Sequence, residues 1–257
     1  MNYWFPPETR DVVGALPTRC RLPDSYLIFD IETTGFSRDY DLIVEAGWAI
    51  THNRQVIDSG GIILDWTRYM PNDWKFQNWF SERLRKLEDA FIQQGRSYTL
   101  TLDRIKAEGV DPLRGLYDYS CLLNEYVSKT RFLAGHGIVK FDCPMLNANF
   151  YRYLGYELQW GNCWLWDTGL IEKAVQANVV PYSYELLPDW YKRVEHTFCK
   201  AKWNLDKHCA EKYQLASRFQ LDMSQAHRAG FDCTLNYALC ETYRQIGETV
   251  YGQEIRC

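Results

Sequence analysis

Two carboxylates stand two residues apart directly after a short apolar run. Asp30 and Glu32 follow residues 26–29, which the sequence predicts to be a buried strand. Side chains two apart on a strand point to the same side, so the pair would share one face at the rim of a core. Two such charges repel each other and are costly to desolvate, and a bound divalent cation would offset both effects. The alternative is a charged strand end that faces water.

Three more residues suited to the same chemistry lie far along the chain. Asp142 is predicted to start a helix, and His227 and Asp232 are predicted to open the last long helix. An acid in a first helical turn is also a common structural feature, because the helix dipole stabilises it. A histidine with a pKa near neutral can take a proton from water, but such a residue by itself more often caps or packs.

Together these five residues contain the groups that phosphodiester hydrolysis needs. The reaction requires a nucleophile made at neutral pH and stabilisation of the charge that develops on the leaving oxygen. Two cations about 3.5–4 Å apart supply both. Mg²⁺ and Mn²⁺ prefer oxygen ligands, so four carboxylates from three separated segments could hold two ions while the histidine acts as the base.

The same segments resemble the three exonuclease motifs of the DEDDh family, the DnaQ-like group of proofreading exonucleases. The stretch 30–35 matches D-x-E-x-T-G, and the stretch 227–232 matches H-x-A-x-x-D. His136 and Asp142 match the second motif, with Gly137 in the place of the usual Asn and one extra residue between the two. This longer spacing looks more like the TREX-type branch and the exonuclease domains of replicative polymerases.

Two further segments are similar to the same family. The stretch 41–47 resembles its second strand, and the stretch 166–168 resembles the turn after its fifth strand. The resemblance covers about residues 24–247, with the exception of residues 66–98, which are predicted to be an insertion. That insertion could cover the substrate groove, pair subunits or grip a duplex.

The resemblance implies an α/β, RNase H-like fold, with a five-stranded mixed sheet flanked by helices. The length fits a single domain, which is predicted to span residues 1–257. The order of the predicted elements agrees, because three antiparallel strands in the first third precede strands that alternate with helices. The turn between the second and third strands is expected at residues 52–54, and Gly60-Gly61 is expected to mark a bulge. Residues 1–24, with four prolines, are predicted to form an irregular lead-in.

By the same resemblance the protein would be a 3′→5′ exonuclease that releases nucleoside 5′-monophosphates from single-stranded or 3′-terminal DNA or RNA. Asp30, Glu32, Asp142 and Asp232 would bind two Mg²⁺ or Mn²⁺ ions, and His227 would be the general base. The alternatives are a catalytically silent nucleic-acid-binding module, and a phosphodiesterase that acts on short RNA or small nucleotides. Silent copies usually lack some of the catalytic positions, all of which are filled here.

Four residues match family positions that contact the terminal nucleotide. They are Thr33, Thr34, Phe36 and His136. Phe36 stands where the family usually has a leucine that wedges against the terminal base. The alternative is that Phe36 covers the core.

Composition limits the remaining possibilities. The net charge of −4 argues against a protein that coats nucleic acid by charge alone. The nine cysteines include no C-x-x-C pair and follow no apolar leader, which favours reduced thiols and an intracellular location, cytoplasmic or nuclear. No apolar stretch approaches the ~20 residues of a membrane span. A zinc site is the one competing metal hypothesis, and its candidate ligands are His196, Cys199, His208 and Cys209.

Overall fold

The computed structural model describes residues 22–95, 98–160, 163–177, 179, 182, 185–199 and 204–254, with side chains up to residue 245. Most of the predicted lead-in, residues 1–21, lies outside the described residues. The residues that follow it are irregular up to the first strand, as predicted, and Leu22 is already buried in the core.

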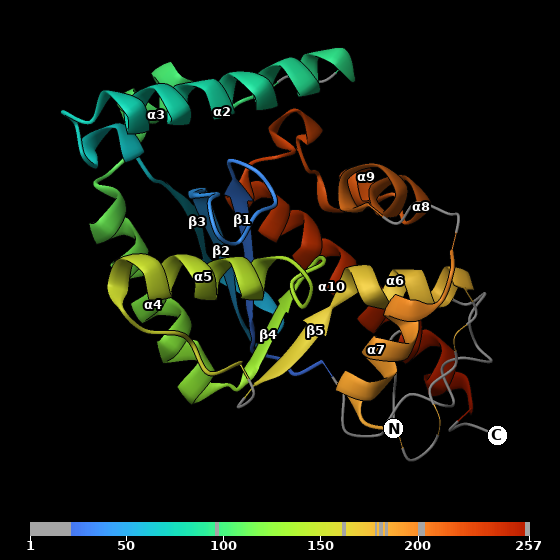
Figure 1. Ribbon diagram of the computed structural model, residues 1–257. Coiled ribbons are helices and arrows are strands. Elements are labelled where there is room, and N and C mark those ends of the chain that lie inside the picture. Colours follow the sequence, from blue (N-terminus) through green and yellow to red (C-terminus); the bar gives the residue numbers. More distant parts are fainter. Residues whose placement is uncertain are drawn as a thin grey trace.

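A five-stranded mixed sheet lies at the centre of the molecule, as predicted (Figure 1). Its strand order is β3-β2-β1-β4-β5. The first three strands pair antiparallel, whereas β1 pairs parallel with β4, and β4 pairs parallel with β5. The strand bounds are Leu27–Thr33 for β1, Ile43–His52 for β2, Gln55–Ile63 for β3, Phe132–Gly135 for β4 and Trp164–Asp167 for β5.

The hairpin between β2 and β3 turns at Asn53 and Arg54, which have φ of 49° and 66°. Two successive left-handed residues match the right-handed twist of the two strands, so the predicted turn is confirmed. The predicted bulge at Gly60-Gly61 is wrong, because the register shift lies between Ile50 and Thr51.

Helices cover both faces of the sheet (Figure 1). On one face lie α6 (Thr168–Ala177), α7 (Leu187–His196) and α10 (Ala229–Glu254), and on the other lie α4 (Pro112–Lys129) and α5 (Asp142–Leu154). Each face has its own apolar core. Successive side chains of β1 enter the two cores alternately, because strand residues point to opposite sides.

The predicted insertion, residues 66–98, forms a short 3-10 turn, Trp66–Arg68, and one long helix, α2 (Trp74–Gln93). Trp66 is fully buried, and its indole N–H donates to the Ile43 carbonyl at 2.6 Å, which fixes the segment to β2. Asp73 caps α2 by accepting from two backbone N–H groups. In Figure 1 the helix crosses above the end of the sheet at which β1 finishes, and α3 (Leu102–Glu108) follows it.

The segment between α7 and α10 is built from short pieces. A π-helical turn, Leu205–Cys209, continues into α8 (Ala210–Lys212), and α9 (Leu215–Phe219) and a 3-10 turn, Met223–Gln225, follow. Asn204 caps the π turn by accepting from the backbone N–H of His208 at 3.3 Å. These pieces carry the chain to the start of α10.

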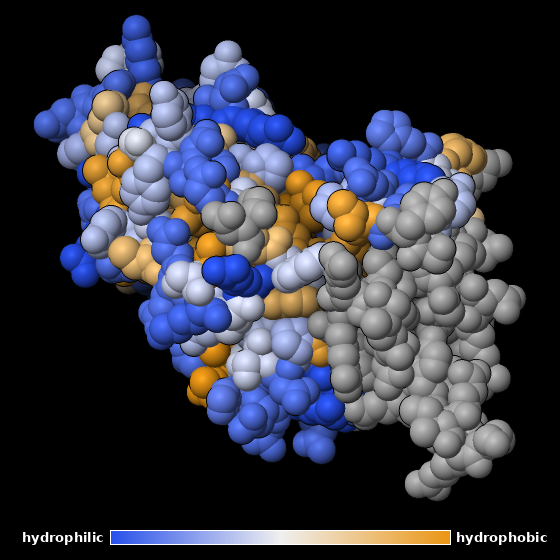
Figure 2. Space-filling view, turned by 90° about the horizontal axis from the view of Figure 1, so that it is seen from below, coloured by the Kyte–Doolittle hydropathy of each residue, from blue (hydrophilic) through white to orange (hydrophobic). Residues whose placement is uncertain are grey.

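The face of the molecule opposite α2 shows mainly hydrophilic side chains where it is described, with apolar residues in small groups among them (Figure 2). None of the described helices combines the length and the apolar character that crossing a bilayer requires.

Candidate active site

Asp30 and Glu32 lie at the C-terminal end of β1, on the face that α10 covers. Their neighbour Ile28, in phase with them, belongs to the core on that face, whereas Phe29 and Ile31 belong to the opposite core. The alternation of strand residues therefore places both carboxylates on one side, as the sequence predicts.

The first residue of α5 is held directly against this strand. Asp142 is 3% exposed, and its Oδ1 accepts from the backbone N–H of Ile31 at 3.0 Å. Ile31 stands between the two acids of β1. The carboxylate of the second motif is therefore fixed beside those of the first, across 111 residues of sequence.

A buried ion pair attaches the third motif to the sheet. Glu45 on β2, paired with Glu32 in the strand register, accepts from the Nε of Arg228 at 2.8 Å and from the backbone N–H of Ala229 at 3.0 Å. Glu45 is 1% exposed. The start of α10, and with it Asp232, is thereby held against the middle of the sheet.

Glycines let the start of α10 approach the strands. A Cβ at Gly47 would overlap the carbonyl group of Ala229, and a Cβ at Gly230 would lie 2.7 Å from the carbonyl oxygen of Gly60. Only residues without a side chain fit at such contacts. On β3 itself, a Cβ at Gly60 would lie 2.8 Å from the ring of Trp48, whereas a Cβ at Gly61 would make only ordinary contacts.

His227 lies just before α10 in the left-handed region, with φ of 67°. Its backbone N–H donates to Oδ1 of Asp232 at 3.4 Å. Ligand atoms of Glu32, His227 and Asp232 all lie within 4.8 Å of one another. Histidine is one of the few residues besides glycine that adopt left-handed backbone readily.

The four acids are electrostatically unfavourable as they stand. Burial, and then the charges of Asp142, Asp232 and Glu32, raise the pKa of Asp30 well above its usual value. Burial raises the pKa of Asp142 to about 8, although its hydrogen bond from Ile31 opposes the shift. Burial likewise raises the pKa of Asp232 to about 7, against the opposing effect of His227.

Divalent cations fit this arrangement. Within the described residues, no lysine or arginine forms an ion pair with any of the four acids. Arg228, whose charge partly opposes the raised pKa of Glu32, is paired with Glu45. Buried carboxylates without a cationic partner are the oxygen ligands that Mg²⁺ and Mn²⁺ prefer. Asp30, Glu32, Asp142 and Asp232 could hold such ions.

Two residues that the sequence did not indicate also contact His227. Oδ2 of Asp206, on the π turn, lies 3.4 Å from Nε2 of His227. The ring of Phe91, near the end of α2, stands edge-on to the imidazole, with centroids 5.1 Å apart and an interplanar angle of 86°. Neither residue belongs to a motif, so no local pattern could have identified them.

The predicted substrate contacts in the loop after β1 differ in their accessibility. Thr34 is 2% exposed, and its hydroxyl donates to Asp41 at 2.9 Å and accepts from the Leu42 N–H at 2.9 Å. Its side chain is therefore occupied by the fold. The hydroxyl of Thr33 donates to the carbonyl of Gly35 at 2.7 Å.

Phe36 is 87% exposed and has one edge-on ring contact, with Phe141 at 5.6 Å. The alternative in which it covers the core is therefore wrong. Its position beside the first motif leaves the ring free to meet a ligand.

The second-motif loop is organised by the residue that ends β5. Asp167 is fully buried and accepts from the backbone N–H groups of Gly137 at 2.9 Å and Val139 at 3.0 Å. Gly137 has φ of 84°, a conformation that Asn also tolerates, so glycine can replace the usual Asn here. Nδ1 of His136 lies 3.0 Å from the hydroxyl of Thr168, which orients its ring.

The zinc hypothesis is wrong for the residues that the structure describes. His196, Cys199, His208 and Cys209 form no metal-binding group, whereas Glu32, His227 and Asp232 do. Cys209 is buried in the core on the α10 side. His208, its neighbour in the sequence, places Nε2 3.2 Å from a carboxylate oxygen of Glu172.

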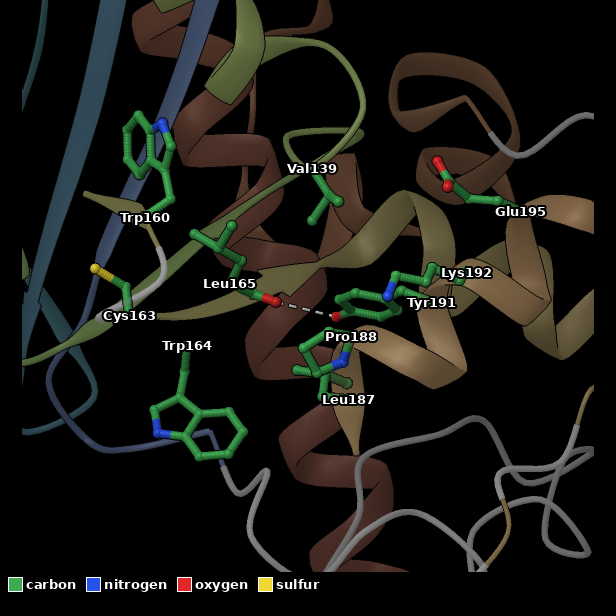
Figure 3. Close-up of a pocket in the computed structure, with 10 residues that line it drawn as sticks. All are labelled: Val139, Trp160, Cys163, Trp164, Leu165, Leu187, Pro188, Tyr191, Lys192 and Glu195. Carbon is green, nitrogen blue, oxygen red and sulfur yellow. Dashed lines mark hydrogen bonds between the residues drawn. The ribbon is translucent and has the colours of Figure 1, made fainter. Parts of the chain in front are cut away.

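A separate apolar cavity of about 420 Å³ opens between β5 and α7 (Figure 3). Trp160, Trp164 and Leu187 line it, and the hydroxyl of Tyr191 donates to the Leu165 carbonyl at 3.2 Å. That hydroxyl also accepts from the N–H of Asp167 at 3.0 Å, so it satisfies backbone groups on the outer edge of β5. None of the four acids lines this cavity.

Comparison of the sequence with protein-family models and with curated proteins gives no match. Comparison of the structure with solved structures does give matches. A zinc-bound complex of E. coli exonuclease I with single-stranded DNA has a TM-score of 0.55 and 15% identity, over 90% of this chain and 43% of that one. E. coli exonuclease I with a dA16 oligonucleotide has a TM-score of 0.52 and 16% identity, over 89% and 43%.

A product-bound structure of exonuclease I has a TM-score of 0.53 and 15% identity, over 90% of this chain and 46% of that one. This chain shares the RNase H-like fold of exonuclease I. It spans less than half the length of these solved structures. At this level of identity the likeness concerns the fold, and the function rests on the site.

Proposed function

We propose that this protein is a metal-dependent exonuclease that removes nucleotides from the 3′ ends of nucleic acid. One observation supports the proposal above all others. Four buried or half-buried acids from three remote segments gather at the end of β1, two of them, Glu32 and Asp232, lie beside His227, and no lysine or arginine among the described residues pairs with the four. A fold that leaves such repulsion uncompensated is suited to a ligand that carries positive charge.

In this proposal Asp30, Glu32, Asp142 and Asp232 hold two Mg²⁺ or Mn²⁺ ions. Bound divalent cations lower the pKa of an attacking water and neutralise charge on the phosphate. His227 takes the proton from that water, and its position within 4.8 Å of ligand atoms of Glu32 and Asp232 suits this role. A nucleoside 5′-monophosphate leaves.

The surface beside the first motif receives the terminal nucleotide. The exposed ring of Phe36 stacks on or wedges against the terminal base, since aromatic faces bind bases without regard to sequence. In this proposal Thr33 and Thr34 contact the nucleotide through backbone groups, and the imidazole of His136 contacts it from the second-motif loop. Single-stranded DNA is the first substrate to test, because two solved exonuclease I structures of the same fold are complexes with DNA oligonucleotides.

The test uses DNA and RNA oligonucleotides labelled at the 5′ end, with Mg²⁺, with Mn²⁺ or with a chelator. We expect a ladder that shortens one nucleotide at a time and needs the cation. Phosphorothioate linkages at the 3′ end should block it, whereas the same linkages at the 5′ end should not. Cleavage that survives the 3′ block would contradict the proposed direction.

A matched pair of variants assigns the cleavage to this site. Asp232→Ala should abolish hydrolysis, whereas Asp118→Ala, an exposed acid on α4, should cut like the wild type. Oligonucleotide binding without cleavage would instead favour a silent binding module. Cleavage restricted to dinucleotides and very short RNA would favour a small-substrate phosphodiesterase, so a length series belongs in the assay.

A further inference from the structure

We infer that Phe91 and Asp206 are positioning residues that hold the imidazole of His227 from two sides. The inference rests on the proposed function, because it concerns the base of that reaction. Neither residue lies within the segments that resemble exonuclease motifs. One comes from the insertion and the other from the π turn before α10.

His227 needs support from outside its own helix. It stands before the first residue of α10, in left-handed backbone, and its side chain is 23% exposed. Its N–H hydrogen bond to Asp232 fixes the backbone but leaves the side-chain torsions unrestrained. A base that samples several rotamers spends only part of its time in the reactive one, and orientation contributes strongly to rate.

Asp206 approaches the ring from the π turn. Its Oδ2 lies 3.4 Å from Nε2 of His227, and its side chain is only 14% exposed. Leu205 and Cys209, on the same turn, are buried in the core on the α10 side. The carboxylate is thus carried by a turn that is anchored at both ends, so it defines one direction for the imidazole.

Phe91 approaches the same ring from α2. Besides its edge-on contact with His227, it packs against Tyr98 with ring centroids 5.1 Å apart. Arg83, on the same face of the helix eight residues earlier, pairs with the buried Asp41 at 2.6 Å. Asp41 also accepts from Thr34, so α2 is locked to the first-motif loop and reaches the third motif near its end.

This arrangement assigns the insertion a role. Of the three possibilities that the sequence left open, it favours a helix that covers the catalytic end of β1. Removing the ring of Phe91 should free the imidazole without touching the four acids. We therefore expect the turnover number to fall while the affinity for substrate stays the same.

The experiment compares Phe91→Ala with Ile92→Ala, because Ile92 is the next residue of α2 and is 61% exposed. We expect Phe91→Ala to lower kcat about 10-fold or more with KM within about twofold, in line with the cost of a misplaced catalytic group. Ile92→Ala should match the wild type. Phe91→Tyr, which keeps the ring, should retain most of the wild-type kcat. Asp206→Ala, made as a separate single variant, should also lower kcat.

A double-mutant cycle separates positioning from a general effect on the fold. In a His227→Ala background, Phe91→Ala should cause no further loss of the residual rate, because the group it positions is gone. An equal further loss would overturn the inference. So would a Phe91→Ala enzyme with wild-type kcat.

Nuclear magnetic resonance gives a readout that is independent of activity. The chain has five histidines, and His227→Ala identifies the imidazole signal of His227. That signal should shift in Phe91→Ala, through loss of the neighbouring ring, and stay in place in Ile92→Ala. An unmoved signal contradicts the contact itself. If wild-type protein cuts nothing while the signal shifts, the proposed function fails and the contact stands.

Discussion

The molecule contains two acidic sites, one around Glu172 and one at the end of β1, that the fold treats in opposite ways. Glu172, on α6, accepts from Nζ of Lys212 at 2.8 Å and from the hydroxyls of Tyr213 at 2.8 Å and Tyr243 at 2.9 Å. Burial alone would raise the pKa of Glu172, but these donors outweigh burial and leave the pKa below its usual value. The chain itself therefore supplies the cation and the hydrogen-bond donors that stabilise the charge of Glu172.

The acids at the end of β1 have the reverse environment. Burial raises the pKa of Asp30 and of Glu32 well above their usual values, and neighbouring carboxylates raise both further. The comparison teaches that burial by itself does not mark a functional acid. What distinguishes the β1 cluster is that like charges surround it and that its compensation has to come from a ligand.

The largest expected effect separates the two clusters by activity. Asp30→Asn should lower kcat by at least about 10³-fold, because cation binding supplies several kcal/mol of transition-state stabilisation. The metal-free variant should be no less stable than the wild type, since a repelling charge has been removed. Mononucleotide release and thermal unfolding measure the two effects. Normal cleavage by Asp30→Asn would refute the site.

His227→Ala tests the base beside the acidic cluster. The turnover number should fall roughly 10²–10⁴-fold, the usual share of a general base, while divalent cations still raise the melting temperature. His52→Ala is the matched control, because His52 lies at the far end of β2 and is exposed. A loss of less than about tenfold near neutral pH would remove His227 from that role.

Glu172→Gln should show the opposite behaviour. The free energy of unfolding of this variant should be about 3 kcal/mol lower than that of the wild type, because Lys212 loses its partner in a largely buried network. Glu125→Gln, which breaks an exposed pair with Lys129, should change it by less than about 1 kcal/mol. Urea unfolding measures both. The cation-induced rise in melting temperature should persist in both variants, and its loss in Glu172→Gln would show that the clusters are coupled.

The smallest expected effect is a pH dependence of the metal-free protein. The pKa of Asp142 is raised to about 8 and that of Asp232 to about 7, so the folded state holds protons that the unfolded state releases near pH 4. The stability from these groups is complete below pH 4 and is lost as pH rises through 7 and 8. The free energy of unfolding should therefore fall from pH 5 to pH 8.

Saturating Mg²⁺ should remove that decline, and Asp142→Asn should reduce it, because each abolishes repulsion between ionised acids. Unfolding curves at pH 5, 6, 7 and 8 with and without the cation suffice. A metal-free protein that gains stability over this range would contradict the raised pKa values.

Features that depend on neighbouring residues could be predicted from the sequence. The apolar run before Asp30 gave a buried strand, and the two-residue spacing gave a shared face for Asp30 and Glu32. The turn predicted within residues 52–54 is confirmed at Asn53 and Arg54, and the five-stranded mixed sheet that the family resemblance implies is confirmed as well. The periodicity of strands and helices depends on residues a few positions apart, so a local sequence pattern is enough to predict it.

Contacts between remote segments were decided only by the tertiary structure. No pattern near Phe91 or Asp206 indicates that each meets His227, and no pattern near Thr34 indicates that its hydroxyl is consumed by Asp41. Gly230 illustrates the same point, because the carbonyl oxygen of Gly60 that it approaches belongs to a strand about 170 residues earlier in the chain. Chemistry-bearing residue types are fixed by the sequence, but which side chains surround them depends on the path of the whole backbone.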